Sequence, residues 1–499
     1  MVVQAAVDQE QTSGNQNATV ESKQRRPWLC IAVTALACTI FLAHAPLITA
    51  GNWRVDEYHD FGLFRARGWS FFFERLLTWS PRPLSETLVG LYFLAEEWLR
   101  RQLIVPFLAL MWATLLVGPV LFVWQNRARG NDWSRSLIAC SVLAMFLLGH
   151  RIAEMLYWPM GAVVYATTLA ALSCLTFQIV DGRWQTRGGR LFGVALVLCA
   201  AGSAEVGAIF AIYFAVAMVL LHLSGRVGTR REGLLWLLPL LVAIGVMLML
   251  AHGRGTLEEH VFYQGAAPNL RYLNHPLTSL RRSLPTYLTQ LIVLDGGQSG
   301  AAASVWGFGI KALFFLGLLA CMQGVRPQPG ARLLLVALLL SLQATFLTSI
   351  AGSYYKFGLV CCERHDTFRQ CIIVLTALSG AALIAAKAGP RLRLNTSRGA
   401  ALIGLALLLL TIQRLPDLIA VYEVRPTLVK IRRANWASGT SAGDRMVFLM
   451  APSPPIVDGM VPPEHASLSF DQDPPWLWQL IMTFFQKRHI ELTPIPQPG

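Results

Sequence analysis

Long apolar segments recur along most of this chain and are separated by short polar stretches. The first runs from Pro27 to Ala50, and others follow near 103–124, 161–180, 233–251, 304–322 and 333–351. A helix needs about 20 apolar residues to cross the hydrocarbon core of a bilayer. Of the 499 residues, 54% are hydrophobic and only 14% are charged, whereas soluble domains carry about 25% charged residues. These features predict an all-α polytopic membrane protein.

The basic residues gather between the apolar segments. The formal net charge of +14 would on its own fit a nucleic-acid-binding protein. Basic clusters that alternate with apolar segments are instead typical of the cytoplasmic loops of membrane proteins. We therefore expect no nucleic-acid partner and place these clusters in the cytoplasm. They are Lys23, Arg25 and Arg26; Arg127, Arg129 and Arg135; Arg183, Arg187 and Arg190; Arg226, Arg230 and Arg231; Arg326 and Arg332; and Lys387, Arg391, Arg393 and Arg398.

An even number of membrane crossings must separate two cytoplasmic clusters. The segment Leu191–Leu223 would measure about 50 Å as one helix at 1.5 Å per residue, which is too long for an upright span and would break this rule. We expect a hairpin there, with its tip at 202–205. Shorter or later spans are expected at Ser136–Gly149, 371–386 and Gly399–Gln413. The total is about eleven transmembrane helices, with the N-terminus in the cytoplasm and the C-terminus outside.

Three parts of the chain differ in composition. Residues 1–26 are polar and are expected to form a disordered cytoplasmic tail. Residues 27–413 are the expected transmembrane domain, with outer juxtamembrane helices within 51–102. Residues 414–499 are rich in proline, and one strand at Met446–Met450 and one helix at Trp476–Lys487 are expected there. We predict that they form a small extracytoplasmic C-terminal module.

An acidic stretch follows the first apolar segment directly. Asp56, Glu57, His59 and Asp60 lie within residues 52–60. We expect this stretch to be a loop at the membrane surface, where an ionised carboxylate is hydrated and can still reach a lipid head group. Most other acidic residues also fall in the expected outer loops, which favours an external working face.

Two charged, aromatic segments follow the acidic stretch. The segment 68–79 carries five aromatic residues among its charges and is too short to span a membrane. It is typical of an interfacial helix that lies at the level of the lipid head groups, with its aromatic residues inward and its charged residues, Glu74 and Arg75, facing water. The prolines at 81 and 83 break this helix and flank Arg82, and a second juxtamembrane helix is expected over Leu84–Arg101.

The order of these features resembles that of the GT-C fold glycosyltransferases, integral-membrane enzymes that take sugars from polyprenyl-phosphate carriers. The resemblance covers most of the chain as architecture, through short motifs. They are Asp56-Glu57 after the first span, the segment from Trp79 to Arg82 after the interfacial helix, and Glu363-Arg364 before the tenth span. Several GT-C groups also have a second acidic site in a later outer loop. Glu154, which Tyr157-Trp158-Pro159 follows, is the candidate here but matches no strict pattern.

The resemblance implies an inverting transfer of a hexosyl or pentosyl group at the outer face of a bacterial inner membrane. The donor would be a polyprenyl-phosphate sugar, and the acceptor a glycan, a lipid or a protein. Asp56 is then the first choice for the general base that deprotonates the acceptor hydroxyl, and Glu57 the second. The candidates for substrate binding are Asp60, Arg82, Glu154, Arg364, His365 and Arg369. Among these, arginine is well suited to the leaving phosphate, because its guanidinium matches phosphate oxygens with two hydrogen bonds.

Other functions remain open at this point. A polytopic transporter or lipid flippase would share the apolar composition, but it would show charged residues within several spans. A membrane O-acyltransferase would need a histidine beside a span, for which His44, His150 and His222 are candidates. A divalent metal also stays open, since His252, Glu258, Glu259 and His260 have a loosely metal-like spacing without a defined third ligand. A disulfide between Cys371 and either Cys361 or Cys362 is a further open point.

Overall fold

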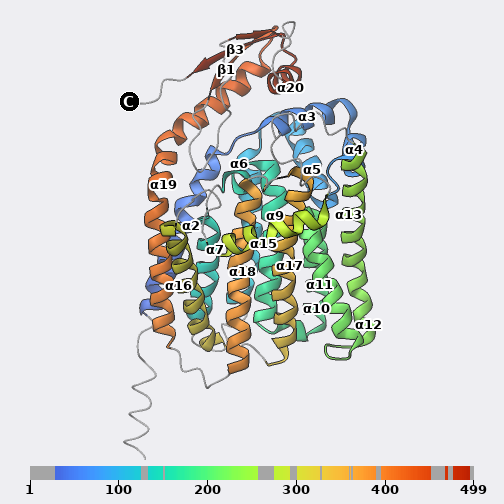
Figure 1. Ribbon diagram of the computed structural model, residues 1–499. Helices are drawn as coiled ribbons and strands as arrows, with labels where there is room; N and C mark the ends of the chain where they lie inside the picture. The colour runs from blue at the N-terminus through green and yellow to red at the C-terminus, as the bar shows by residue number, and fades with distance from the viewer. Residues whose placement is uncertain are drawn as a thin grey trace, which may run out of the picture.

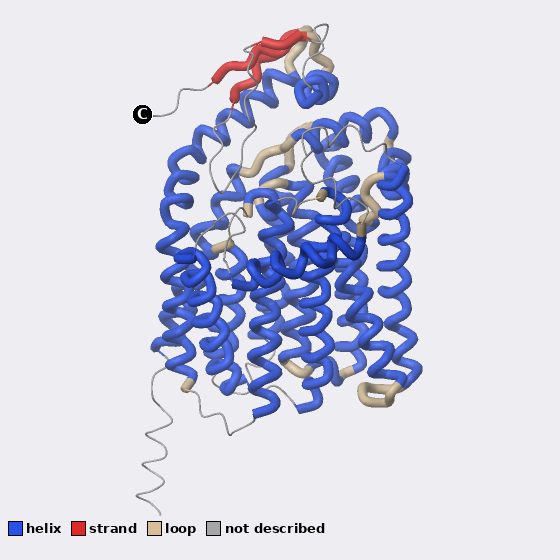
Figure 2. Tube along the Cα trace, in the orientation of Figure 1, coloured by secondary structure: helices blue, strands red, loops and turns tan. Residues whose placement is uncertain are grey.

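The chain folds into a bundle of long helices with a small sheet at one end (Figure 1). The computed structural model describes residues 28–124, 133–149, 152–256, 275–292, 301–325, 329–358, 360, 363–388, 395–450, 467–469 and 476–494. Within these ranges every regular element is helical except for one three-stranded sheet, drawn in red in Figure 2. The expected tail 1–26 lies outside the described residues.

Nine helices in the described ranges are long and apolar enough to cross a membrane, which indicates an integral membrane protein. They begin with α2 (Trp28–His44, continued by the 3₁₀ turn Ala45–Ala50), α6 (Ile104–Trp124), α9 (Pro159–Val180), α11 (Glu205–Leu223) and α13 (Leu237–Thr256), and end with α16 (Ala301–Val325), α17 (Arg332–Phe357), α18 (Glu363–Ala388) and α19 (Thr396–Thr440). Two further helices lie where spans were expected and are shorter: the apolar α7 (Trp133–Leu147), with 15 residues, and α10 (Arg187–Ser203), with 17. Eleven spans were expected, and the assignment of α7 and α10 as membrane spans stays a prediction.

The predicted hairpin within 191–223 is present. Ala204 has an extended backbone, with φ −151° and ψ 154°, and it separates α10 from α11. The two helices pack against each other. A Cβ atom at Gly207 would lie 2.0 Å from the carbonyl oxygen of Ala200, so only glycine permits this close approach.

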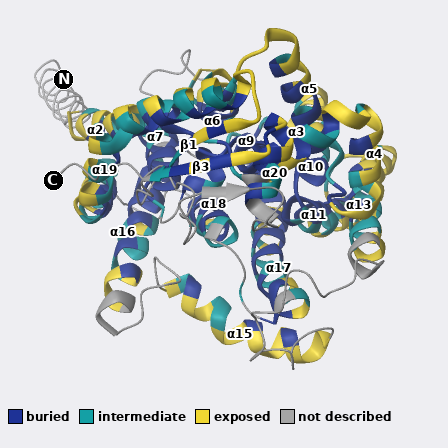
Figure 3. Cartoon of the chain, turned by 90° about the horizontal axis from the view of Figure 1, so that it is seen from above, coloured by how far each residue is buried: buried dark blue, intermediate teal, exposed yellow. Residues whose placement is uncertain are grey.

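Helix α9 forms the centre of the bundle. All 22 of its residues are buried, and α6 and α10 pack on either side of it (Figure 3). The contact with α6 is tight, because a Cβ at Gly118 would lie 2.7 Å from the Cα of Cys174. Two basic residues of α12 (Arg230–Gly233) lie at the lower end of the bundle in Figure 1.

Three helices cover the opposite, upper end: α3 (Val55–Arg67), α4 (Trp69–Thr78) and α5 (Pro83–Leu99). The helices α4 and α5 lie where the two helices were expected, and their position at the membrane surface stays a prediction. The expectation of a loop at 52–60 is wrong, because α3 begins at Val55. Acidic side chains in the first turn stabilise a helix N-terminus, and both Asp56 and Glu57 lie there.

The last long helix extends far beyond its predicted end at Gln413. Helix α19 runs for 45 residues, through Pro416 and Pro426, and rises above the bundle (Figure 1). Side-chain contacts hold its second half against the first span. Tyr422 donates a hydrogen bond of 2.6 Å to the carbonyl of Ala43, and Arg432 donates one of 3.0 Å to that of Thr49. The compact C-terminal part therefore begins after Thr440, and not at Arg414 as the sequence suggested.

The C-terminal part combines a sheet and one helix. Its strands are β1 (Arg445–Met450), β2 (Ser467–Ser469) and β3 (His489–Pro494), in the order β1-β3-β2, with β1 parallel and β2 antiparallel to β3. Helix α20 (Trp476–Phe485) packs on α3. Its Phe484 ring lies 5.5 Å from Tyr58 and 5.6 Å from Phe61. The expected strand and helix of this part are confirmed, and the module rests directly on the helix that carries Asp56.

Candidate functional site

Glu57 fixes the start of α3 against the bundle. It is fully buried and accepts hydrogen bonds from the backbone N–H of Arg54 at 2.9 Å, the Trp158 indole at 2.7 Å and the backbone N–H of Met160 at 3.2 Å. Burial raises the pKa of Glu57 to about 8, although these three donors favour the charged form. Both carboxylate oxygens are occupied, so Glu57 positions α3 beside the start of α9.

We expect the unfolding temperature to fall as the pH rises from about 5 to 8, with a shallower fall in Glu57→Gln. The pKa of Glu57 is about 8 in the folded protein, against an ordinary value of 4.5. The folded state therefore holds a proton that the unfolded chain has released, and this contribution to stability is complete below pH 4.5 and lost as the pH approaches 8. Glutamine keeps the neutral shape and removes the titration.

Thermal unfolding in detergent across this pH range measures the effect. Glu96, whose pKa burial also raises to about 8, supplies part of the remaining slope. Glu74→Gln is the matched control, because Glu74 is exposed on α4. Identical slopes for the wild type and Glu57→Gln would contradict the assignment.

Asp56 differs from its neighbour. Its side chain is solvent-exposed, and no hydrogen bond or ion pair joins it to another residue in the part of the chain that the structure describes. The protein still surrounds it closely. The protein atoms around the carboxylate partly desolvate it, and this desolvation and the charge of Asp60 raise the pKa of Asp56, while Arg364, Arg75 and His59 act in the opposite direction. Asp56 is therefore an accessible carboxylate close to several cations.

Arg75 joins α3 to α5 beside this carboxylate. It donates one hydrogen bond to Asp60 and two to Glu86, and the two to Glu86 measure 3.0 and 3.3 Å. The Asp60 and Glu86 side chains are 1% and 4% exposed. Asp60 also contacts the Nδ1 atom of His59 at 3.0 Å. Its oxygens are thus engaged by protein groups, which makes Asp60 part of the support of α3.

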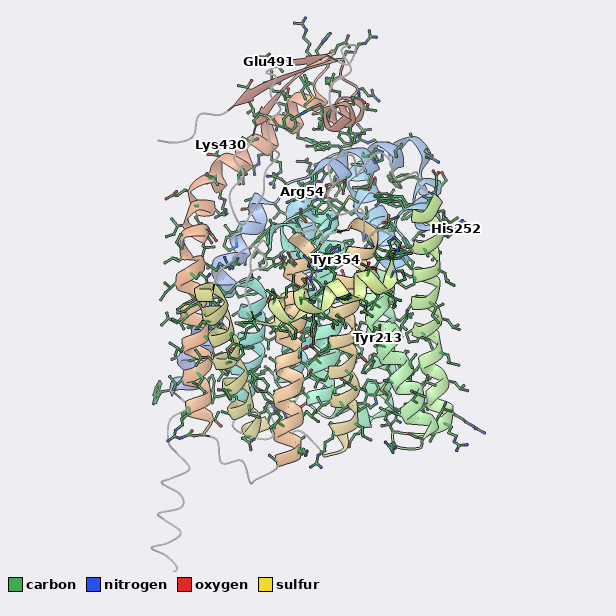
Figure 4. All side chains as sticks on the ribbon, viewed as in Figure 1. Arg54, Tyr213, His252, Tyr354, Lys430 and Glu491 are labelled. Carbon is green, nitrogen blue, oxygen red and sulfur yellow. The ribbon has the colours of Figure 1, made fainter. Side chains whose placement is uncertain are left out.

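Glu154, from the short helix α8 (Ala153–Leu156), lies between two arginines. Its carboxylate is 2.7 Å from Nη1 of Arg54 and 3.8 Å from Nη1 of Arg364. Both guanidinium groups also lie over the Trp158 ring, at 5.3 and 5.6 Å from its centroid. Figure 4 shows Arg54 at the upper end of the bundle, beneath the C-terminal module. The cluster therefore joins the entry to α3 to the start of α18.

A cavity of about 390 Å³ lies between the upper ends of α11, α13, α17 and α18. One part of its lining is apolar and comes from Val206, Ile209, Met247, Leu250 and Ala251. The other part is polar and includes Arg82, Tyr165, Glu205, Lys356, Arg364 and His365. The cavity thus combines an apolar wall with three cationic side chains. Arg364 belongs both to this lining and to the surroundings of Asp56.

Arg82 and Glu205 form a bidentate ion pair at the edge of the cavity. Both hydrogen bonds measure 2.8 Å, and the two side chains are 18% and 13% exposed. Burial acts to lower the pKa of Arg82, but Glu205 outweighs it and holds the pKa above its ordinary value. The pair ties the start of α5 to the tip of the α10–α11 hairpin.

We expect Arg82→Gln to lower the free energy of unfolding by about 1–3 kcal/mol, because it removes the charge-assisted hydrogen bonds that Arg82 donates to the Glu205 carboxylate. The double variant Arg82→Gln, Glu205→Gln should recover part of this loss, since two amides can hydrogen-bond to each other. Thermal unfolding of the two single variants and the double variant forms a cycle that isolates the coupling. Strictly additive effects would show that the pair does not hold the hairpin tip.

The remaining candidates divide between the cavity and the protein interior. His365 lines the cavity, where its Nε2 atom lies 2.9 Å from the Tyr165 hydroxyl. Arg369 is 1% exposed, pairs with Asp366 and is not part of the lining. Its Nε and Nη1 atoms have no hydrogen-bond partner among the described residues. The structure thus brings Arg82, Arg364 and His365 together and leaves Arg369 deeper in the bundle.

The described residues contain no cluster of three histidine, cysteine, aspartate or glutamate side chains that could hold a metal ion. Glu258, Glu259 and His260 lie outside the described residues, as do His150, Cys361 and Cys362. The predictions that involve them stay predictions.

No family model and no curated protein sequence matches this chain. Its function is therefore inferred from the site itself.

Sequence reasoning missed three residues that shape the site. Arg75 was expected to face water and instead points inward, between two carboxylates. Arg54 and Lys356 were not singled out, although the first holds Glu154 and the second lines the cavity. One feature of the sequence could have indicated the position of Arg75. It is a lone arginine among the aromatic residues of a short amphipathic helix, and such a residue can point inward to pair with a buried carboxylate.

Proposed function

We propose that this protein is a glycosyltransferase that moves a sugar from a polyprenyl-phosphate-linked donor to a polar acceptor. The single observation that supports this most is the accessible, unpaired carboxylate of Asp56 close to Arg364, which itself lines a cavity with an apolar wall and a cationic end. A donor that joins a lipid chain to a phosphate needs both an apolar wall and a cationic end in its binding site.

The cavity offers complementary surfaces to such a donor. Its apolar wall on α11 and α13 suits the first isoprenoid units of the carrier, because burial of apolar surface drives their binding. Lys356 and Arg364 suit the phosphate, since charge-assisted hydrogen bonds to phosphate are among the strong ones in proteins. Arg82 contributes through its ion pair with Glu205, which fixes the edge of the cavity.

Asp56 supplies the base in this proposal. It takes the proton of the acceptor hydroxyl as the hydroxyl oxygen attacks the anomeric carbon of the donor. The bond from that carbon to the phosphate oxygen breaks, and the carrier phosphate leaves with the bonding electrons. The nearby cations offset the charge on the departing phosphate, an electrostatic contribution that is often the largest in catalysis. The configuration at the anomeric carbon inverts.

The membrane arrangement belongs to the same proposal. A GT-C-like fold places the acidic helix and the C-terminal module on the outer face of a bacterial inner membrane, with the N-terminus in the cytoplasm. The basic residues of α12 lie at the end of the bundle opposite α3, which agrees with a cytoplasmic lower end under the positive-inside rule. The acceptor, whether a glycan, a lipid or a protein, would approach from beneath the C-terminal module.

A transfer assay tests the proposal. The full chain is reconstituted in vesicles with a panel of radiolabelled polyprenyl-phosphate hexoses and pentoses and with envelope extract as the source of acceptor. We expect label to leave the lipid phase and enter a polar product with at least one donor. Movement of the intact donor across the vesicle membrane without transfer would instead favour the lipid flippase alternative.

A further inference from the structure

A second, larger cavity lies at the other end of the bundle. Its volume is about 500 Å³, and its lining comes from the C-terminal halves of α6 and α9, the turn after α9 and the first turns of α10. It shares no residue with the upper cavity that Arg82 and Arg364 line. The helices α6 and α10 both pack on α9, so α9 forms the floor of a groove between them.

The cavity has an apolar part and a polar part. Leu121, Phe122, Phe177 and Phe192 supply the apolar lining, and the Phe192 side chain is 38% exposed. The polar lining comes from the turn that joins α9 to α10. An amphipathic molecule with its head at this turn and a chain along the two helices would match this distribution.

The polar end favours an anion. Helix α10 has 17 residues and begins after Thr186, whose hydroxyl accepts a hydrogen bond of 3.0 Å from the N–H of Gly189. No described atom outside the helix lies within 4 Å of a Cβ built on Gly188, so there is open space beside the first turn of α10, at the positive end of the helix. Arg183 and Arg135 both contact Asp181. Of these two arginines, Arg183 lines the cavity, and its side chain is 29% exposed.

One buried side chain in the lining points to a ligand in its own right. Gln178 is 5% exposed, and its Nε2 atom donates to the carbonyl of Gly189. Its Oε1 atom is buried without a hydrogen-bond partner among the described residues. Buried acceptors are rarely left unpaired. A ligand that donates a hydrogen bond here would satisfy it.

We infer that this groove binds an anionic phospholipid whose head group carries a hydroxyl as well as the phosphate. The phosphate lies at the N-terminus of α10 beside Arg183, the hydroxyl donates to Oε1 of Gln178, and an acyl chain follows the apolar wall between α6 and α10. The bound lipid then fills the groove at the end of the bundle remote from Asp56, independently of the proposed transferase activity.

Native mass spectrometry of the delipidated full chain tests this assignment. The probes are phosphatidylglycerol, which has both groups, phosphatidylcholine, which has no hydroxyl donor and no net charge, and free glycerol phosphate. We expect at least about tenfold tighter binding of phosphatidylglycerol than of phosphatidylcholine, because only the glycerol head group can donate a hydrogen bond to the buried Gln178 acceptor and only choline adds a positive charge beside Arg183. Equal affinities for the two lipids would overturn the proposal, and so would equally tight binding of free glycerol phosphate.

Two variants locate the binding in the groove. Gln178→Leu keeps the size and removes the acceptor, so it should reduce the preference for phosphatidylglycerol severalfold. Arg183→Gln should weaken phosphatidylglycerol binding about fivefold, a modest effect because the side chain is 29% exposed. Arg183 is partly exposed, so its variant keeps the test decisive should Gln178→Leu fail to fold. Arg226→Gln, in an exposed turn outside the lining, is the matched control, and equal losses in the control would overturn the assignment.

Discussion

Asp56→Asn should lower sugar transfer by about 10²-fold or more, the usual size of a general-base contribution, with little change in protein level or melting temperature. The substitution keeps the shape and hydrogen-bonding capacity of the side chain and removes the base. Because the Asp56 side chain is exposed and has no bonding partner among the described residues, no buried contact is lost. Initial rates of transfer at saturating donor measure the effect.

The dependence of the rate on pH gives an independent check. The base must be ionised to accept a proton, and partial desolvation by the surrounding protein together with the charge of Asp60 raises the pKa of Asp56 above its ordinary value of 3.8. The acidic limb of the profile should therefore lie at higher pH than an unperturbed aspartate would give. Glu74→Gln serves as the control, because this exposed carboxylate of α4 pairs only with Arg67 among the interactions recorded for it. Full activity of Asp56→Asn would remove α3 as the catalytic centre and favour the transporter alternative.

The sequence predicted where the long helices lie, but it did not predict where the last helix ends. The length of the apolar segments located the nine helices that could cross a membrane, and the argument from an even number of crossings located the turn at Ala204. The end of α19 was missed because proline usually breaks a helix. Contacts of Tyr422 and Arg432 with the first span maintain the helix past Pro416, and such contacts between distant segments leave no local signal.

Contacts between distant segments also limit how much of the candidate site can be predicted from the sequence. The acidic stretch and Arg82 could be selected because charges beside an apolar segment are conspicuous. The different roles of Asp56 and Glu57 could not be predicted. They depend on Trp158 and Met160, about a hundred positions away in the sequence, which donate hydrogen bonds to Glu57 and not to Asp56. Burial of Arg75 between two carboxylates depends likewise on how α3, α4 and α5 pack together.

Arg75→Met should produce the largest loss of stability among single substitutions near the site, about 3–5 kcal/mol in the free energy of unfolding. Removal of one partner from a buried ion pair leaves an uncompensated buried charge, which lowers the free energy of unfolding by about this amount. Here two carboxylates, Asp60 and Glu86, are 1% and 4% exposed and would both lose the same cation. Burial acts to lower the pKa of Arg75, yet these two charges outweigh it and raise the pKa, so the arginine is held firmly in its charged form.

A compensated variant separates the buried charge from the loss of packing. The triple variant Arg75→Met, Asp60→Asn, Glu86→Gln removes the charges together and should recover most of the lost stability, because a buried ion network can be replaced by neutral groups at little cost. Arg67→Met is the matched control. Arg67 and its partner Glu74 are 44% and 51% exposed, so its removal should leave the unfolding temperature nearly unchanged. Thermal unfolding in detergent compares the four proteins. If Arg75→Met and Arg67→Met unfold at the same temperature, Arg75 does not join α3 to α5, and the position of Asp56 must depend on Glu57 and the C-terminal module instead.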